Sequence, residues 1–494
     1  MENNSNIKTL FSDTVVYGVS TVLGRLLNWL LMPLYIRTIP KAEYGVVSDV
    51  YAVISVLLVL VTLGFETGYF KFVTDDNRKR LINTQLNTIL VFGSFVTALF
   101  YFFNDSLCQL FNLHVVTSNI FFLAALIVLV DSYNSVLFAD LRFKRKSVKY
   151  SVLRLIQVVV TVLFNLFFIF YLRFQTIAGF DFSTISNVNY ILFANLLGSL
   201  SSTLYFLPSL FRLGFTFDTA LLRQSMFYCM PLVGMGLLGM LNQNIEKMLI
   251  PHLDYHDDTL AQLGEYSANY KIGILMAIFT QSFRLAFEPI IFKNSRSNSD
   301  KKSLYGDALK YFVYFGLIIF AFVMLLMPLV NKFILKPEYY EGNIIIPFVL
   351  IGQLFFGVYY SLSMWYKVID KTYFGLIMSA IGLVVNLVLE FILVPQLGIL
   401  GAAISVMCGF FVMMITSFLL EHRYYPISYP FKKIISTFLI VTTLVLALTY
   451  LYRYVYTDYW IFISIFGLFL VLLIFVLIER KNVIKLLNYV RHRR

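Results

Sequence analysis

The residues best suited to chemistry in this chain are charged side chains that stand inside long apolar stretches. Five of them are basic: Arg25, Arg154, Lys247, Lys271 and Arg284. A charge buried in a bilayer costs from ~2.5 to over ~10 kcal/mol, so each must face a polar cavity or an opposite charge. Cations in such a cavity hold anionic substrates, and carboxylates there bind and release a coupling cation.

Arg25 stands about fourteen residues into the first apolar stretch, roughly 21 Å along a helix, which is too deep to reach the headgroups easily. Gly24 and Asn28 make the same helix face small and polar. We expect Arg25 to bind an anion in a central cavity. The alternative is a structural ion pair with an acid such as Asp49.

Asp49 and Lys271 occupy equivalent positions in two similar helices, each about 9 Å from the outer end. We expect them to form a gate pair that closes on the outer side and parts when that side opens. The alternative is that each residue pairs within its own half of the protein.

The other charged positions have more than one interpretation. Lys271 and Arg284 join Arg25 as candidate substrate-binding cations, although Arg284 can also pair with Glu288 one turn away. Asp131 and Glu390 are candidates for cation coupling, because a carboxylate in a bilayer titrates readily. The seventh apolar stretch ends in a polar cluster that belongs partly to a cavity wall and partly to the outer interface: Gln243, Asn244, Glu246 and Lys247.

Composition places most of the chain in lipid. Of 494 residues, 59% are hydrophobic and 13% charged, and mean hydropathy is +0.78, whereas soluble domains carry roughly 25% charged residues. The net charge of +12 falls in short clusters between apolar runs, as in membrane loops, so nucleic acid is not the expected partner. The three cysteines are scattered and give no disulfide framework, metal site or cofactor motif.

Apolar runs of about 20 residues predict about fourteen membrane spans. They lie near 11–36, 44–70, 82–103, 115–138, 149–172, 188–211, 224–250, 264–292, 306–333, 343–366, 373–394, 399–420, 433–452 and 458–478. With a cytoplasmic N-terminus, 28 of the 39 lysines and arginines fall inside and six outside. The positive-inside rule therefore predicts a multi-pass protein with both termini in the cytoplasm.

An internal repeat indicates the architecture. The windows beginning at Glu43-Tyr44 and Glu265-Tyr266 align without gaps at an offset of 222 and agree at seven positions, including charges at both ends. We expect an all-α polytopic protein with two six-helix repeats related by an axis along the membrane normal. The predicted parts are lobes at 1–215 and 216–425, a two-helix hairpin at 426–480 and a basic cytoplasmic tail at 481–494.

Several short motifs resemble those of a known family. Asn386 precedes Pro395 and a Gly398-x-x-Gly401-Ala402-Ala403 helix start, while Gly18, Ser20, Gly24 and Asn28 mark the first span, with Glu43-Tyr44-Gly45, Pro231 and Glu265-Tyr266 further on. This order resembles the bacterial polysaccharide (O-antigen type) flippases of the multidrug/oligosaccharidyl-lipid/polysaccharide exporter superfamily. The two extra C-terminal spans are similar to those of the fourteen-helix members.

The resemblance implies a flippase, not an enzyme, in the bacterial inner membrane. It would move a polyprenyl-diphosphate-linked oligosaccharide from the cytoplasmic to the outer leaflet by alternating access, with Na⁺ or H⁺ as a possible coupling cation. The last two spans would form a groove for the lipid tail. One alternative is a cation-coupled multidrug-type exporter, which needs an acidic cavity. The other is a membrane glycosyltransferase or polymerase, which needs catalytic carboxylates on a sizeable outer loop.

Overall fold

The computed structural model describes most of the chain. The described residues are 24, 26, 29–113, 119–177, 180–213, 216–255, 258–294, 302–363, 365–366, 371, 373–455 and 457–480. Within them the chain is almost entirely helical. It divides into two compact units: unit 1 comprises Met1–Ala268 and Ser379–Ser405, and unit 2 comprises Asn269–Met378 and Val406–Arg494.

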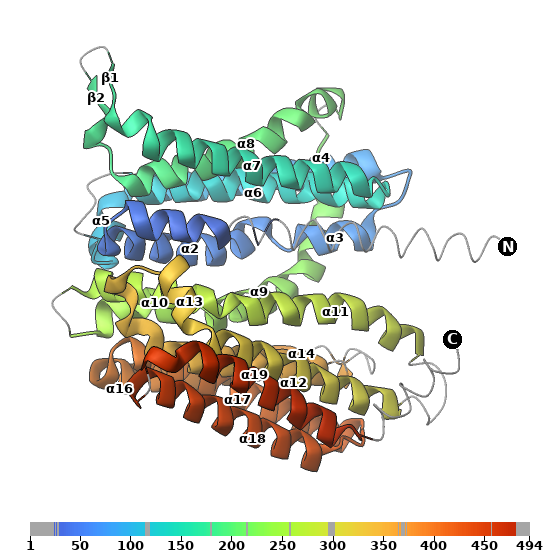
Figure 1. Ribbon diagram of the computed structural model, residues 1–494. Helices are drawn as coiled ribbons and strands as arrows, with labels where there is room; N and C mark the ends of the chain where they lie inside the picture. Colours follow the sequence, from blue (N-terminus) through green and yellow to red (C-terminus); the bar gives the residue numbers. More distant parts are fainter. Residues whose placement is uncertain are drawn as a thin grey trace, which may run out of the picture. The chain divides into compact units, whose positions relative to one another are not determined.

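Unit 1 is built from long apolar helices that pack along one another (Figure 1). After a helix over 29–38 come α2 (Lys41–Thr62), α3 (Phe65–Phe72), α4 (Arg78–Phe102), α5 (Asn104–Leu110), α6 (Ile120–Phe143), α7 (Ser147–Phe170), α8 (Asn187–Leu213), α9 (Thr219–Leu253) and the first part of α10 (Thr259–Ile272). α6 lies at the centre, since it packs against α2, α4 and α8. Its central position explains why most of its side chains are buried.

Unit 2 contains α11 (Ile274–Asn294), α12 (Lys302–Leu325), α13 (Met327–Phe333), α14 (Ile346–Leu362), α18 (Phe431–Tyr450) and α19 (Trp460–Ile478). α16 (Tyr373–Leu397) and α17 (Ile399–Tyr424) contribute to both units. α12 packs against α14, α18 and α19. The hydroxyl of Ser464 on α19 donates to the Leu325 carbonyl oxygen (2.6 Å), which satisfies a buried polar group.

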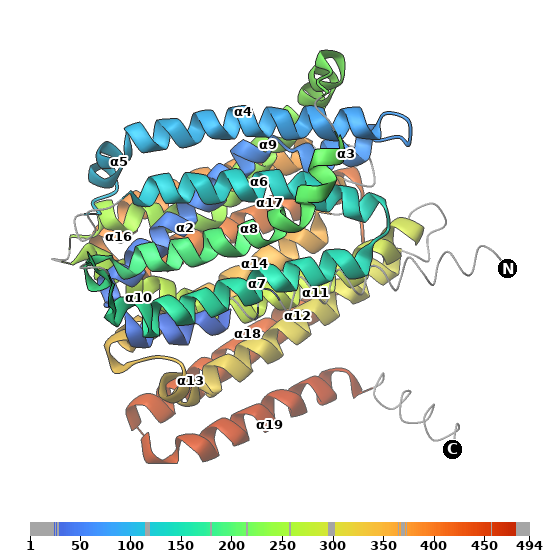
Figure 2. The same ribbon diagram turned by 90° about the horizontal axis from the view of Figure 1, so that it is seen from above.

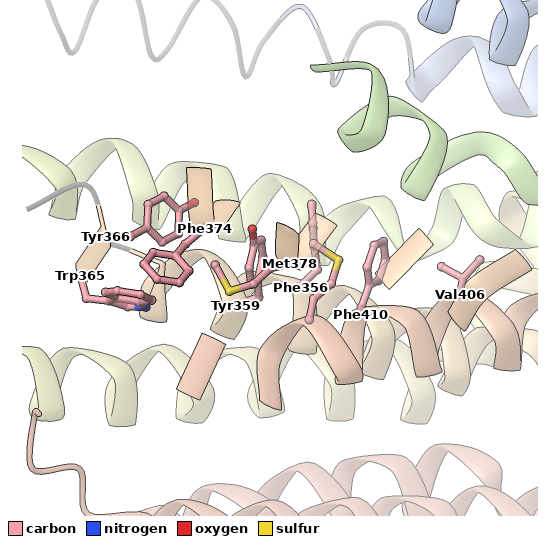
Figure 3. Close-up of a cluster of buried hydrophobic side chains, with 9 residues drawn as sticks. Phe356, Tyr359, Trp365, Tyr366, Phe374, Met378, Val406 and Phe410 are labelled. Carbon is pink, nitrogen blue, oxygen red and sulfur yellow. The ribbon is translucent and has the colours of Figure 1, made fainter. Parts of the chain in front are cut away.

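An aromatic cluster forms part of the unit 2 core (Figure 3). Phe356 stacks on Phe410 with ring centroids 4.4 Å apart, and Trp365 packs against Phe374 at 5.0 Å. These large side chains are buried, so they stabilise helix packing and are not available for stacking on a ligand.

Three of the predicted spans are interrupted, and in the ninth the break falls at Leu326 between α12 and α13. The sequence predicts one helix from Glu43 to Lys71, but the chain breaks between α2 and α3, where Leu63 and Gly64 have φ of 51° and 66°. The eighth span breaks at Gly273 between α10 and α11; a β-carbon there would lie 2.4 Å from Val349 Cγ1. Apolarity sets the length of a span, whereas such breaks depend on local backbone conformation and packing.

Twelve helices of the described residues are long and apolar enough to cross a membrane. They correspond to every predicted span except the first, which lies largely outside the described residues, and the interrupted eighth. The chain is therefore a multi-pass membrane protein, and the total of fourteen spans stays a prediction. A short hairpin, in which β1 (Thr176–Ile177) pairs antiparallel with β2 (Phe180–Asp181), interrupts the helices.

Candidate functional site

α2 and α10 cross in very close contact inside unit 1. A β-carbon on Gly45 would lie 2.0 Å from the Leu260 carbonyl oxygen, and one on Gly264 would lie 2.1 Å from the Lys41 carbonyl oxygen. Any side chain at either glycine would strike backbone, which cannot move aside cheaply. The crossing thus depends on two glycines, the device that lets membrane helices approach closely.

An ion pair reinforces this crossing. Lys41 Nζ contacts the Glu265 carboxylate, which is 1% exposed as a residue. Beside it, Asn187 Nδ2 donates to Glu43 Oε2 at 2.8 Å and so ties α8 to the start of α2. The helix ends near Lys41 therefore form a closed polar contact, and we call Lys41, Gly45, Gly264 and Glu265 the α2–α10 clasp.

Asp49 lies one turn along α2 from Gly45. It is 1% exposed, and neither of its carboxylate oxygens has a hydrogen-bond partner within the described residues. Lys271 is half-buried near the end of α10. Asp49 belongs to unit 1 and Lys271 to unit 2, so their pairing as a gate stays a prediction.

Two glutamates on α9 and α16 form a buried carboxylate pair within unit 1. Glu246 and Glu390 are both 0% exposed, and all four carboxylate oxygens lack hydrogen-bond partners in the described part of the chain. The two carboxylates are close enough to interact electrostatically. Lys247 Nζ lies 3.9 Å from Glu246 Oε1. A buried carboxylate without hydrogen bonds is costly when ionised, so this pair is suited to binding a proton or a metal cation.

Each glutamate follows a buried asparagine by one helical turn. Asn242 Nδ2 donates to the carbonyl oxygens of Leu238 and Ser379, both at 2.8 Å, and so joins α9 to α16. Asn386 is 1% exposed, and neither its amide oxygen nor its amide nitrogen has a partner among the described residues. The side-chain oxygen of Asn386 is therefore available as a ligand beside Glu390. This Asn-x-x-x-Glu spacing occurs in both helices and is visible in the sequence, where only Glu390 was selected as a coupling residue.

Asp131, the other coupling candidate, has partners. Gln157 Nε2 donates to Asp131 Oδ1 at 3.3 Å and to Ser199 Oγ at 3.1 Å. Arg154 Nη1 donates to Gln157 Oε1 at 3.3 Å, and its guanidinium lies 4.1 Å from the Phe138 ring centroid. Arg154 thus belongs to a polar network that joins α6, α7 and α8.

Of the candidate substrate-binding cations, Arg25 lies outside the described residues, whereas the surroundings of Arg284 can be given. The Arg284 guanidinium lies 5.2 Å from the Tyr360 ring centroid, and its buried Nε has no hydrogen-bond partner within the described part of the chain. The Glu288 side chain is outside the described residues, so its pairing with Arg284 stays a prediction.

A second ionic cluster, not predicted from the sequence, ties α3, α4 and α6 together. Asp140 accepts hydrogen bonds from Arg78 Nε (2.6 Å) and Nη2 (2.9 Å) and from the Tyr69 hydroxyl (2.8 Å), and Lys144 Nζ lies 2.8 Å from its other oxygen. We call these four residues the Asp140 network. Tyr69 and Arg78 lie 71 and 62 positions from Asp140 in the sequence, and charges near helix ends are ordinary, so only the fold brings these residues together.

The described residues contain no group of three or more His, Cys, Asp or Glu side chains that could hold a metal ion. Any cation at Glu246 and Glu390 would need further ligands from amide or carbonyl oxygens. Such a site is typical of reversible cation binding and not of a tightly held catalytic metal.

The described residues form a bundle of long apolar helices with charged side chains buried among them. The sequence profile described as polysaccharide biosynthesis protein matches residues 10–295, more than half of the chain. The chain belongs to this polysaccharide biosynthesis protein family. None of the curated proteins matches it.

Solved structures share the fold. Lipid II flippase MurJ in an inward closed conformation is similar at 16% identity and a TM-score of 0.72, with 95% of this chain and 100% of that chain covered. The MATE multidrug transporter DinF-BH is similar at 16% identity and a TM-score of 0.60, with 84% of this chain and 95% of that chain covered. The Vibrio cholerae MATE transporter VcmN is similar at 15% identity and a TM-score of 0.58, with 85% of this chain and 97% of that chain covered. The chain therefore shares the fold of MurJ and the MATE transporters.

Proposed function

We propose that this protein is a flippase that moves a polyprenyl-diphosphate-linked oligosaccharide from the cytoplasmic to the outer leaflet of the bacterial inner membrane. Family membership supports a role in surface polysaccharide synthesis, and the MurJ-like fold supports transport of a lipid-linked substrate. The observation that supports alternating access is the α2–α10 clasp, because its two glycines let the helices approach closely and the Lys41–Glu265 ion pair holds them in contact.

In this proposal, cationic side chains bind the diphosphate of the substrate. A diphosphate needs charge-assisted donors, and Arg25, Lys271 and Arg284 are the candidates. The half-buried Arg284 keeps one guanidinium face on Tyr360 and an unused Nε donor within the described residues. The carboxylate pair Glu246–Glu390 would bind Na⁺ or H⁺ and couple its movement to transport.

The test is Arg25→Ala and Arg284→Ala in a host whose surface glycan depends on this protein, with the exposed Arg80→Ala as the matched control. We expect both variants to lose surface glycan and to accumulate the lipid-linked unit inside, at a normal level of folded protein, while Arg80→Ala behaves as wild type. Normal glycan in both variants would remove these cations from the substrate site. Loss of the protein itself would make the residues structural.

The buried glutamate pair also suits a second function, a cation-coupled multidrug-type exporter. Drug susceptibility of a deletion strain distinguishes the two: an exporter protects against drugs, and a flippase restores glycan. The enzymatic alternative, a glycosyltransferase or polymerase, has less support. Of the outer-loop acids, Asp258 caps α10 by accepting from the Ala261 N–H at 2.9 Å, Asp254 is buried, and Asp257 lies outside the described residues.

A further inference from the structure

Unit 1 contains a crevice between α4 and α6 that none of the proposed steps uses. Its volume is about 460 Å³, within the range of ~300–1,000 Å³ that ligand sites occupy. α4 and α6 run side by side with α5 at one end (Figure 2). Tyr101 and Phe102 of its lining are 52% and 78% exposed, and both helices are long and apolar enough to span a membrane, so we infer that the crevice opens toward lipid.

The two ends of the crevice are set by specific contacts. At one end, a β-carbon on Gly93 would lie 2.6 Å from Leu129 Cδ1, so the helices touch there. At the other end, the Tyr101 and Phe122 rings meet edge to face with centroids 5.2 Å apart. From Gly93 to Tyr101 is about 12 Å along the helix at 1.5 Å per residue, close to half of the ~30 Å hydrocarbon core.

The walls are suited to a hydrocarbon chain. On α4 the small side chains of Ser94, Thr97 and Ala98 leave the space, and on α6 Leu126 and Leu129 form the opposite wall. The Thr97 hydroxyl already donates to the Gly93 carbonyl oxygen at 2.8 Å, so it offers little to a polar ligand. The hollow therefore fits a linear apolar chain and not a polar solute.

The charges near the Tyr101–Phe122 end of the crevice indicate which kind of lipid would place an acyl chain there. The sequence contains no lysine or arginine between Arg80 and Arg142, so neither helix supplies a cation for a diphosphate at the crevice. Asn104 Oδ1 accepts from the Phe121 N–H at 3.2 Å, which fixes the start of α5 beside the start of α6. The next residue, Asp105, is exposed three positions after Phe102 of the crevice lining, and its carboxylate, which accepts from Asn104 Nδ2 at 3.1 Å, carries a negative charge.

We propose that the α4–α6 crevice binds one acyl chain of an amine-bearing phospholipid, with the lipid ammonium facing Asp105. The occupant is a resident membrane lipid of the outer leaflet and not the transported substrate, because the mouth complements an ammonium and repels a diphosphate. This assignment uses the topology in which α4 starts at the cytoplasmic side. It is independent of the substrate and of cation coupling.

The experiment uses the full-length protein in nanodiscs of phosphatidylethanolamine and phosphatidylglycerol at 3:1, with a trace of phosphatidylethanolamine that carries a diazirine in one acyl chain. Labelled peptides are mapped by mass spectrometry. We expect labelling on 94–101 and 122–129 to fall at least fivefold in Ala98→Phe, which fills the crevice. Val91→Phe, at an exposed position of the same helix, should leave it unchanged.

Two further arms test the headgroup. Asp105→Asn should reduce labelling by the phosphatidylethanolamine probe at least threefold while a phosphatidylglycerol probe with the same chain is unaffected. Equal labelling by both probes in the wild type would overturn the amine assignment, and stronger labelling by a diazirine-bearing polyprenyl phosphate would assign the crevice to the substrate tail instead. If Ala98→Phe folds poorly, Ser94→Leu serves as the second filling variant. Unchanged labelling in a folded filling variant overturns the site.

Discussion

Lys41 and Glu265 stand 224 positions apart in the sequence and form an ion pair across the α2–α10 crossing. The Glu265 side chain is 2% exposed and the Lys41 side chain 21%. Removing one partner of such a pair takes away a charge that compensates the other, which costs more than the pair contributes. The pair therefore biases the protein toward the state in which α2 and α10 are in contact at this crossing.

Reversing one charge should open the clasp. We expect Lys41→Glu or Glu265→Lys to shift the equilibrium away from the closed crossing by about 1–3 kcal/mol, or roughly 5- to 150-fold, given the partial exposure of Lys41. The double reversal should recover most of the loss. The measurement is the labelling rate of a cysteine at the buried Ser48 by a membrane-impermeant thiol reagent, in a background without Cys108, Cys229 and Cys408. Equal labelling in all three variants would contradict the role of the pair.

Closure of the crossing should also depend on its glycines. Gly45→Ala and Gly264→Ala each place a β-carbon about 2 Å from a carbonyl oxygen, so the helices must separate. We expect faster labelling at Ser48 and reduced transport in both variants. Gly239→Ala is the matched control, because a β-carbon there meets nothing within 4 Å and alanine is the better helix former by about 1 kcal/mol. A defect in the control equal to those in the two variants would show that glycine is needed for another reason.

The Asp49–Lys271 gate makes a separate prediction. If the two residues pair when the outer side is closed, exchanging their charges should restore more transport than either Asp49→Lys or Lys271→Asp alone. A surface-glycan assay in the dependent host measures this. An exchange no better than the worse single variant would indicate that each residue has a partner within its own unit.

Glu246 and Glu390 should act together. Because their four carboxylate oxygens lack hydrogen bonds within the described residues, Glu390→Gln removes charge without breaking a contact, so the protein should fold normally. We expect transport in vesicles to lose its dependence on the Na⁺ or H⁺ gradient, with a tenfold or larger fall in rate, and Glu246→Gln to behave alike. Glu338→Gln at a surface pair is the control. Retained gradient dependence in both variants would move coupling to Asp131 or elsewhere.

Apolar runs and charge placement were sufficient to predict the helical membrane fold, since bilayer thickness fixes the length of a span and basic residues favour one side. They could not predict the breaks at Leu63–Gly64 and Gly273. A positive φ at a leucine is a local conformation that no propensity anticipates.

The candidate site, like the fold, was predicted from the sequence only in part. Glu390 was predicted because a carboxylate inside an apolar helix is conspicuous on its own. Glu246 was recognised only as part of a polar cluster at a helix end, because its partner lies 144 positions away. Lys41 and Glu265 stand near the starts of the second and eighth predicted spans, where a single charge is unremarkable. Their significance comes from the crossing of two helices, which sequence spacing does not encode.

The Asp140 network provides a test of stability as distinct from transport. Asp140→Asn removes the acceptor for Arg78 and Lys144 and leaves two cations facing each other around a neutral amide. We expect a loss of about 2–4 kcal/mol in the free energy of unfolding, toward the lower end for a partly exposed cluster. Glu66→Gln breaks the more exposed pair with Arg142, which joins α3 to α6, and should cost below about 1 kcal/mol.

Thermal unfolding of the purified protein in detergent compares the Asp140→Asn and Glu66→Gln variants. Equal melting temperatures would mean that burial does not strengthen the Asp140 network. If Asp140→Asn instead abolished transport at an unchanged melting temperature, the network would hold the α3 end in position for the transport cycle and would not stabilise the fold.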